Sequence, residues 1–256
     1  MDRNNLLWML SSGHPIIHRG KINKDCVEHG KSSFRSCIEQ NYPIEVDLMM
    51  LKDQQIVVWR DGPVSVADTR RISSLSLSEI RSIAYNNARD PLNQLMTLDE
   101  FIRMIDGNVG VIFEIKVPYE ISPNATVQAV LLMLKEYRGE FAIHSSNPFA
   151  LQMIRTACPR IPLGQISLSF NHVNHVNQSF VKLHREFRFT DIVVPDFLSY
   201  DVRDLSDLCI RERANAFCRL YGIPLISWAV RNAEEERVAR TCCENYIIEG
   251  AISYID

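Results

Sequence analysis

Short apolar runs recur along this chain with helix-like stretches between them, and this alternation limits the fold more than any other feature. Each run spans four to seven residues and is bounded by turn-forming residues, which is typical of strands covered on both faces. The runs lie at 15–18, 44–48, 110–116, 140–144, 161–166, 191–194, 223–228 and 246–249. We therefore expect eight strands.

The stretches between the runs show helical periodicity. In residues 31–40, for example, Phe34, Cys37 and Ile38 follow the i, i+3, i+4 spacing of one helix face. Further helices are expected at 5–10, 78–84, 98–106, 125–136, 148–157, 205–220 and 233–241. Strands that alternate with helices over about 250 residues predict an α/β fold, the TIM (β/α)8 barrel. An open doubly wound sheet is the alternative, but the glycine-rich turn that usually marks it does not occur in this sequence.

The chain length suits a single domain, 1–256, with one insertion. Residues 51–108 are too many for one strand-to-helix connection, so we expect an extra strand at 55–59 and two short helices there. The eighth run is followed by only about seven residues, too few for a closing helix. Residues 5–10 are expected to cover that gap from the N-terminal side.

Charge, hydropathy and cysteine content exclude several classes of protein. The 28 basic and 31 acidic residues give a net charge of −3, which offers no electrostatic basis for binding nucleic acid. No apolar run is long enough to span a membrane. The seven cysteines are scattered and lack zinc-ligand spacing. These features predict a cytoplasmic protein that binds neither nucleic acid nor membrane, and they leave a homodimer open.

Carboxylates gather in the second and third runs. Glu45 and Asp47 are two residues apart, as are Glu114 and Lys116, so each pair shares one face of its strand. A TIM barrel forms its site at the C-terminal strand ends, where three such carboxylates would repel one another without a cation. Oxygen ligands suit Mg²⁺ or Ca²⁺. The alternative is that each acid pairs with Arg19 or Lys116 and that no metal binds.

Two further residues at the end of the first run, His18 and Arg19, are candidates to transfer a proton and to bind phosphate. Arg19, together with Lys116, would bind phosphate oxygens beside such a cation. His18 is the histidine best placed to act as a general acid or base next to these carboxylates.

The order of motifs along the chain resembles the glycerophosphodiester phosphodiesterase family. The resemblance begins with PIIHRG, EHGKSSF, PIEVDLMMLKDQQIVVWRD and FEIK. It continues through NPFALQMIRTACPRIPLGQIS, VVPDFLSYDV and GIPLISWAVRNAEEERVARTCCENYIIEG, from about residue 14 to 250. It implies a TIM barrel that uses a divalent cation to cleave a phosphodiester into an alcohol and a phosphomonoester.

Matched position by position, the resemblance implies roles for particular residues. His18 corresponds to the first of two catalytic histidines of the family. The implied metal ligands are Glu45, Asp47 and Glu114. The implied substrate and phosphate contacts are Arg19, Glu28, Lys116 and Trp228.

The second catalytic histidine of the family is replaced here by Arg60, in WRD. Arginine stays protonated and cannot transfer a proton, and loss of a general acid or base typically costs ~10²–10⁴ in rate. Arg60 could still stabilise charge on the phosphoryl oxygens. His29 and His144 are the candidates to replace the lost acid, whereas His172 and His175 fit a polar loop better. Met49 stands where the family often has a polar residue, which indicates a changed substrate mouth.

Three functions follow from these observations. The first is a phosphodiesterase that needs Mg²⁺ or Ca²⁺ and acts on a small glycerophosphodiester-like or sugar phosphodiester, those of the agrocinopine kind included. Its catalytic residues would be His18, Arg19 and Arg60. The second is a barrel that binds a phosphodiester or phosphosugar without cleaving it. The third is a phosphoryl transferase or lyase that forms a cyclic phosphate.

Overall fold

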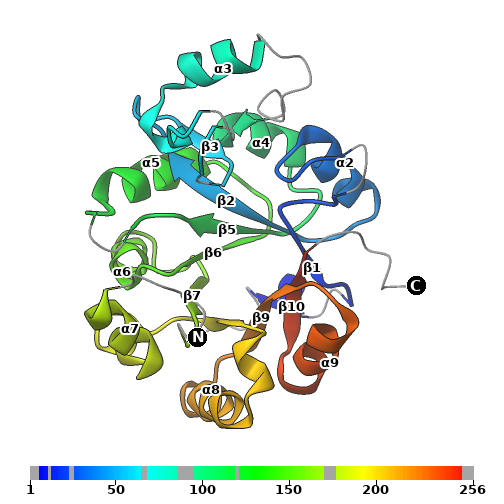
Figure 1. Ribbon diagram of the computed structural model, residues 1–256, viewed down its shortest axis with the longest axis vertical. Helices are drawn as coiled ribbons and strands as arrows, with labels where there is room; N and C mark the ends of the chain where they lie inside the picture. Colours follow the sequence, from blue (N-terminus) through cyan, green and yellow to red (C-terminus); the bar gives the residue numbers. More distant parts are fainter. Residues whose placement is uncertain are drawn as a thin grey trace.

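Eight parallel strands close into a barrel in the computed structural model, which describes residues 6–10, 13–22, 26–60, 62–64, 68–85, 95–118, 121–169 and 177–249 (Figure 1). The strands follow one another around the barrel, and closure occurs because β1 pairs with both β10 and β2. In order they are β1 (Ile16–His18), β2 (Ile44–Met50), β5 (Val111–Ile115), β6 (Phe141–Ser145), β7 (Leu163–Ser167), β8 (Phe197–Asp201), β9 (Leu225–Val230) and β10 (Asn245–Ile248). The predicted TIM barrel is confirmed.

Helices form the layer outside the barrel (Figure 1). They are α2 (Lys31–Glu39), α4 (Leu98–Ile105), α5 (Asn124–Leu134), α6 (Pro148–Ala157), α7 (Gln178–Arg185), α8 (Leu208–Tyr221) and α9 (Ala233–Cys242). Single 3₁₀ turns lie at η2 (Ile72–Ser74), η4 (Arg188–Asp191) and η5 (Asp204–Ser206). Several helix starts are set by the sequence, since Asn147 and Asn232 each accept hydrogen bonds from the first turn that follows them. Among the described residues, no helix has the length and apolar character needed to cross a bilayer.

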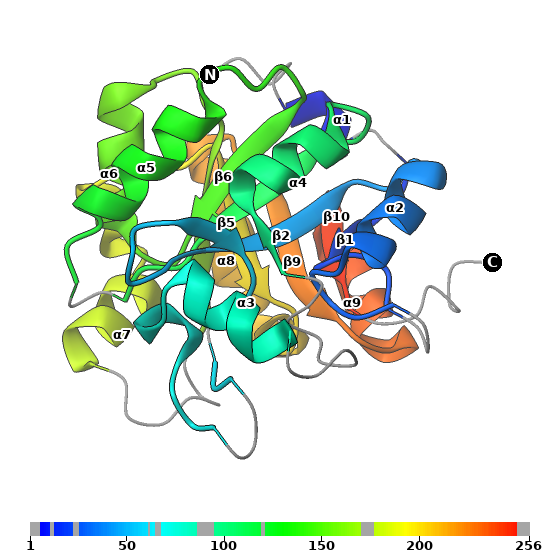
Figure 2. The ribbon, with the colours of Figure 1, turned by 90° about the horizontal axis from the view of Figure 1, so that it is seen from above.

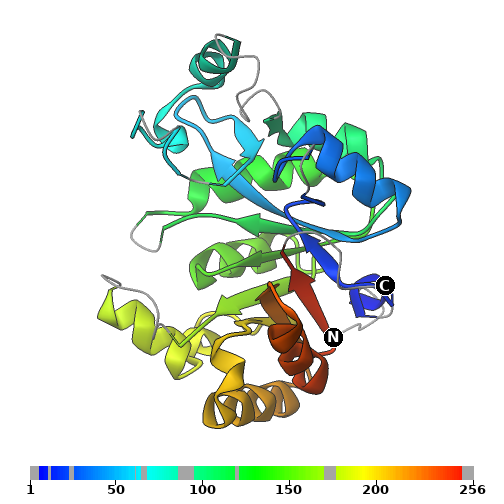
Figure 3. The same cartoon turned by 45° about the vertical axis from the view of Figure 1, so that its right-hand side comes forward.

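The residues between β2 and β5 form the predicted insertion. They contain β3 (Ile56–Val58) antiparallel to β2, then α3 (Leu77–Tyr85), and β4 (Met96–Thr97), which pairs with β3. A small apolar cluster holds this segment together, and Met49 and Trp59 belong to it. Met49 therefore packs beneath the insertion. Two views show α3 at the opposite end of the molecule from α8 (Figures 1 and 3).

A short helix, α1 (Leu7–Leu10), precedes the first strand (Figure 2). Leu6 and Met9 are buried against inward-facing residues of the barrel, Ile16 and Ile112 among them. The ring of Trp8 lies over Gly110, where a Cβ would come within 2.0 Å of it. The N-terminal residues therefore close the N-terminal end of the barrel, and they do not take the place of an outer helix as expected.

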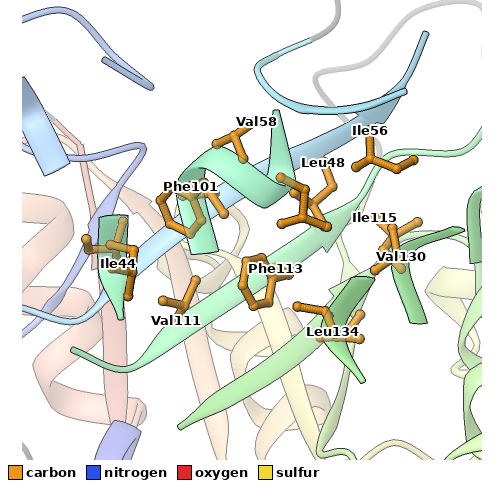
Figure 4. Packing of buried hydrophobic residues seen from close by; sticks show 14 of the residues in the cluster. Ile44, Leu48, Ile56, Val58, Phe101, Val111, Phe113, Ile115, Val130 and Leu134 are labelled. Carbon is orange, nitrogen blue, oxygen red and sulfur yellow. The ribbon is translucent and has the colours of Figure 1, made fainter. Parts of the chain in front are cut away.

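Residues alternate along the barrel strands between the outer helical layer and the interior. The outward side of β2 carries Ile44, Val46 and Leu48, which join the main core, whereas Glu45 and Asp47 point inward. Figure 4 shows this core around Phe101 and Phe113, between the sheet and helices α4 and α5. The alternation explains how acidic residues occur in a strand that is buried on both faces.

Register then sets the inward side chains side by side. His18 pairs with Glu45 across β1 and β2, and Asp47 pairs with Glu114 across β2 and β5. Glu114 in turn pairs with His144 of β6. Because residues in register on neighbouring parallel strands point to the same face, all five meet inside the barrel mouth.

In the second half of the chain one predicted strand is wrong and one helix was not predicted. The residues expected to form a strand at 191–194 are instead the last residue of η4 and the loop after it, and the strand is β8, which begins six residues later. Pro195 lacks the N–H that a strand ladder needs, and Val194 is 45% exposed. β8 was hidden because its inward positions include Ser199 and Asp201, which look polar in sequence. Helix α7, capped by Asn177, was not expected at all.

Candidate active site

A cavity of about 220 Å³ opens at the C-terminal ends of the barrel strands. Side chains from β1, β2, β5, β6, β7, β9 and β10, and from the residues that follow them, line it. Six of the residues to which the family resemblance assigns roles are among the lining residues: His18, Arg19, Glu45, Glu114, Lys116 and Trp228. His144, Arg231 and Glu249 also line it.

Glu45, Glu114 and His144 form a group that could hold a metal ion, and we call them the ligand cluster. Each offers one ligand atom, and these atoms lie within 4.8 Å of one another. Nε2 of His144 is 3.4 Å from Oε1 of Glu45. The other oxygen, Oε2, is buried without a hydrogen-bond partner among the described residues. Two carboxylates and an imidazole whose ligand atoms lie this close together fit a divalent cation.

Burial shifts the proton affinity of the groups in the cluster. It raises the pKa of Glu45 to about 8, with the nearby Asp47 charge adding to the effect. It also raises the pKa of Glu114, against the attraction of Lys116. Burial lowers the pKa of His144 to about 4, so its imidazole is neutral at pH 7. Without a cation, the cluster therefore takes up a proton on a carboxylate.

Asp47 contacts the cationic side chains of the site. Its Oδ2 lies 2.8 Å from Arg19 Nε, and its Oδ1 lies 3.1 Å from Lys116 Nζ. Burial would raise its pKa, but Lys116, His29 and Arg19 together hold that pKa below the usual range. In this arrangement Asp47 neutralises two cations, as the metal-free alternative supposes. Its role as a metal ligand stays a prediction.

Lys116 and Arg19 line the same cavity as the ligand cluster. Lys116 Nζ lies 2.6 Å from Glu114 Oε1, and its pKa is raised because Glu114 and Asp47 outweigh the effect of burial. Arg19 adopts a left-handed backbone conformation, with φ of 60°. Its N–H donates to the carbonyl of Glu45 at 2.8 Å, which fixes the loop after β1 on β2. Both cations are thus held at the rim of the cavity before any ligand arrives.

Glu28 forms ion pairs with both arginines that the sequence predicts at the site, Arg19 and Arg60. Arg19 Nη1 donates to Glu28 Oε2 at 3.0 Å, and Arg60 Nε pairs with Glu28 Oε1. Arg60 is 53% exposed, and neither Arg60 nor Glu28 is among the described residues that line the cavity. Arg60 therefore lies outside the residues that line the cavity and connects to the site through Glu28, which Arg19 also contacts.

His29 and His144 differ in their suitability as a replacement acid. His29 is fully buried, and its Nε2 accepts a hydrogen bond from the Asp47 N–H at 3.1 Å. Burial lowers the pKa of His29 to about 3, and its contact with the backbone of β2 makes it a positioning residue. His144, by contrast, lines the cavity. His172 and His175 lie outside the described residues.

An ion pair that the sequence reading missed lies beside Trp228. Arg231 Nε is 2.7 Å from Glu249 Oε2, and Arg231 also donates from Nη1 to the carbonyl of Ala229. Trp228 Nε1 is buried without a hydrogen-bond partner among the described residues. Arg231 and Glu249 follow β9 and β10 directly, so the rule that barrel sites form at strand ends could have found them.

The family model described as "Glycerophosphoryl diester phosphodiesterase family" matches residues 18–245. No curated protein sequence matches the chain.

Several solved structures share the fold. A Galdieria sulphuraria protein proposed to be a glycerophosphodiester phosphodiesterase has a TM-score of 0.70 at 20% identity, with 93% of each chain covered. A glycerophosphodiester phosphodiesterase from Thermotoga maritima has a TM-score of 0.66 at 19% identity, covering 91% of this chain and 92% of that one. An Oleispira antarctica phosphodiesterase, solved with the product sn-glycerol-3-phosphate, has a TM-score of 0.70 at 17% identity and covers 94% of each chain. At these identities the likeness establishes the fold.

The family match extends over nearly the whole barrel, from His18 at the end of β1 to Asn245 at the start of β10. It thus includes every site residue that the sequence motifs singled out. The chain therefore belongs to the glycerophosphoryl diester phosphodiesterase family and, with it, to the phosphoric diester hydrolases.

Proposed function

We propose that this protein is a metal-dependent phosphodiesterase that releases an alcohol and a phosphomonoester from a small diester. One observation carries the proposal. A single cavity combines the ligand cluster with two cationic side chains, Arg19 and Lys116, and with the imidazole of His18. A bound divalent cation would polarise a phosphoryl oxygen and orient the reacting groups.

Arg19 and Lys116 would bind the remaining phosphoryl oxygens. Arginine presents a rigid fork of donors, and lysine presents a compact charge. Asp47 holds both at the rim, so little rearrangement is needed when the anion binds. Arg60 would add a third positive charge when it exchanges Glu28 for the substrate, and this charge would favour the transition state.

His18 would act as the general base. Its Nε2 lies 3.6 Å from Glu45 Oε2, and burial, followed by the Arg19 charge, lowers its pKa to about 3. The imidazole is therefore neutral and able to accept a proton from the attacking hydroxyl or water. A bound phosphate would offset the charges of Arg19 and Lys116, which both lower this pKa, and so would make His18 a stronger base.

The alcohol part of the substrate would lie against Trp228, Arg231 and Glu249. An indole face with a planar charged pair beside it suits a polyol, since the ring packs on C–H groups while the pair exchanges hydrogen bonds with hydroxyls. These side chains support a glycerophosphodiester-like or sugar phosphodiester substrate, those of the agrocinopine kind included.

A direct experiment compares reaction products. The metal-free protein is incubated with a panel of glycerophosphodiesters and sugar phosphodiesters, with a divalent cation or a chelator, and products are followed by phosphorus NMR. We expect a phosphomonoester that forms only with the cation. A cyclic phosphate would instead identify a transferase or lyase. Thermal stabilisation by a diester without any product would identify a binding protein and overturn the proposal.

A further inference from the structure

We propose that the ligand cluster holds its cation through a nitrogen atom, Nε2 of His144, and therefore selects Zn²⁺, Co²⁺ or Fe²⁺ over Mg²⁺ and Ca²⁺. The inference rests on the proposed function, because it concerns the metal of the same site. Mg²⁺ and Ca²⁺ are hard ions that prefer oxygen ligands, whereas imidazole suits Zn²⁺ and its neighbours in the first transition series.

The distances fit one ion between these ligands. Nε2 of His144 and Oε1 of Glu45 are 3.4 Å apart. Two ligand atoms that lie about 2.0–2.2 Å from a tetrahedral ion are themselves about 3.3–3.6 Å apart. Glu114 supplies a third ligand atom within 4.8 Å of both. An ion can therefore enter with side-chain shifts of only a few tenths of an ångström at the first two ligands.

The fold makes room for His144 at this position. Gly164 of β7 lies directly beside it in register. A Cβ on residue 164 would be 2.9 Å from the Cβ of His144 and 2.2 Å from the ring of Phe197. Phe197 in turn packs near the imidazole, with the ring centroids 6.4 Å apart. Glycine at 164 thus leaves space for both rings, and the packing directs the His144 imidazole toward Glu45.

Each oxygen of Glu45 faces a different histidine of the cavity, and this gives the two histidines different roles. Oε1 faces His144, and Oε2 faces His18 at 3.6 Å. His144 is 2% exposed, compared with 16% for His18. The deeper imidazole is therefore the ligand, and the shallower one stays free to exchange a proton with the substrate.

Metal binding tests this inference independently of turnover. Chelator-treated protein is titrated calorimetrically with Zn²⁺, Co²⁺, Mg²⁺ and Ca²⁺, and the absorption spectrum of the Co²⁺ form is recorded. We expect Co²⁺ to stay bound against a 100-fold excess of Mg²⁺ or Ca²⁺ (about 10²-fold selectivity). Displacement of Co²⁺ by that excess would overturn the inference, and this arm needs no variant.

The variant His144→Gln removes the nitrogen ligand and keeps a polar side chain of similar reach. Loss of outer partners of a metal ligand alone costs about 10–100-fold in affinity, so we expect Co²⁺ binding to weaken by at least about 100-fold and its spectrum to change. Mg²⁺ binding should change far less. The matched control is His184→Gln, a histidine equally buried but on α7 and outside the lining residues. Thermal unfolding in chelator checks that both variants fold.

Two results would count against His144. One is a Co²⁺ spectrum that is the same in wild type and His144→Gln. The other is a thiolate charge-transfer band, because it would place the metal on the cysteines. Failure of the proposed function would look different, since it would show selective metal binding with no phosphodiester cleaved.

Discussion

Replacing Asp47 by asparagine tests whether this carboxylate neutralises cations or ligates the metal. Its two oxygens lie 2.8 Å from Arg19 Nε and 3.1 Å from Lys116 Nζ. Removing one partner of a buried ion pair costs about 3–5 kcal/mol, because the other charge stays buried without a counter-ion. Lys116 is 33% exposed and recovers some hydration. We therefore expect the lower end of that range, a loss of about 3 kcal/mol in the metal-free protein.

Urea denaturation in the presence of a chelator measures this loss. In thermal unfolding, the same loss of 3 kcal/mol would lower the Tm of a chain of this length by about 6–12 °C. Asp201→Asn is the matched control, since Asp201 is also a buried carboxylate at a strand end, but its partner Arg203 is 44% exposed. We expect the control to lose less than half as much.

The reasoning would be refuted by one combination of results. If Asp47→Asn loses less than about 1 kcal/mol in chelator, the level of an exposed ion pair, then Asp47 does not hold the cations. A large fall in metal affinity in the same variant would make it a metal ligand instead, as the family resemblance implies.

Three other predictions concern proton transfer, pH and packing. Arg60→His should raise turnover of glycerophosphodiesters by about 10²-fold, measured by alcohol release, and no rise would mean that the missing proton donor is not the obstacle. In chelator, the free energy of unfolding should fall by about 2 kcal/mol between pH 6.5 and 8, because the folded chain keeps a proton on Glu45 that the unfolded chain has lost. A divalent cation should abolish that fall in a pH series of urea titrations, and a flat metal-free profile would contradict it. Gly164→Ala should lower the free energy of unfolding by about 1–3 kcal/mol through overlap with Phe197. Gly62→Ala should lower it less in the same urea titrations, because no contact among the described residues is closer than 3.9 Å.

Local patterns were enough to predict most of the barrel. The alternation in β2 predicted both the strand and the shared face of Glu45 and Asp47, because side-chain direction follows directly from the two-residue period. The α6 bounds were predicted correctly because Asn147 and Pro148 start that helix unambiguously. Strand-end reasoning also brought His18 and Lys116 to one cavity, since parallel strands in a barrel end together.

Features that depend on neighbouring strands could not be predicted in this way. His144 joins Glu45 and Glu114 only through the register of three strands and the space beside Gly164. The different partners of the two acids in β2 also depend on neighbouring strands. Asp47 faces Arg19 and Lys116, whereas Glu45 faces two histidines. β8 was misplaced because the polar side chains on its inner face conceal a strand from any rule based on apolar runs.

The base of the barrel is closed by the side chains that fill its interior, and α1 covers them from outside. Leu6 and Met9 pack on the inner apolar layer, and Trp8 covers Gly110 beside them. Among the described residues, the cavity lies at the opposite end, where Arg19 and Arg231 line it, so ion and substrate would both enter from the C-terminal side of the barrel. In the proposed reaction both products would leave through this opening. We expect release of the phosphomonoester to limit the rate, because its charge would bind Arg19 and Lys116.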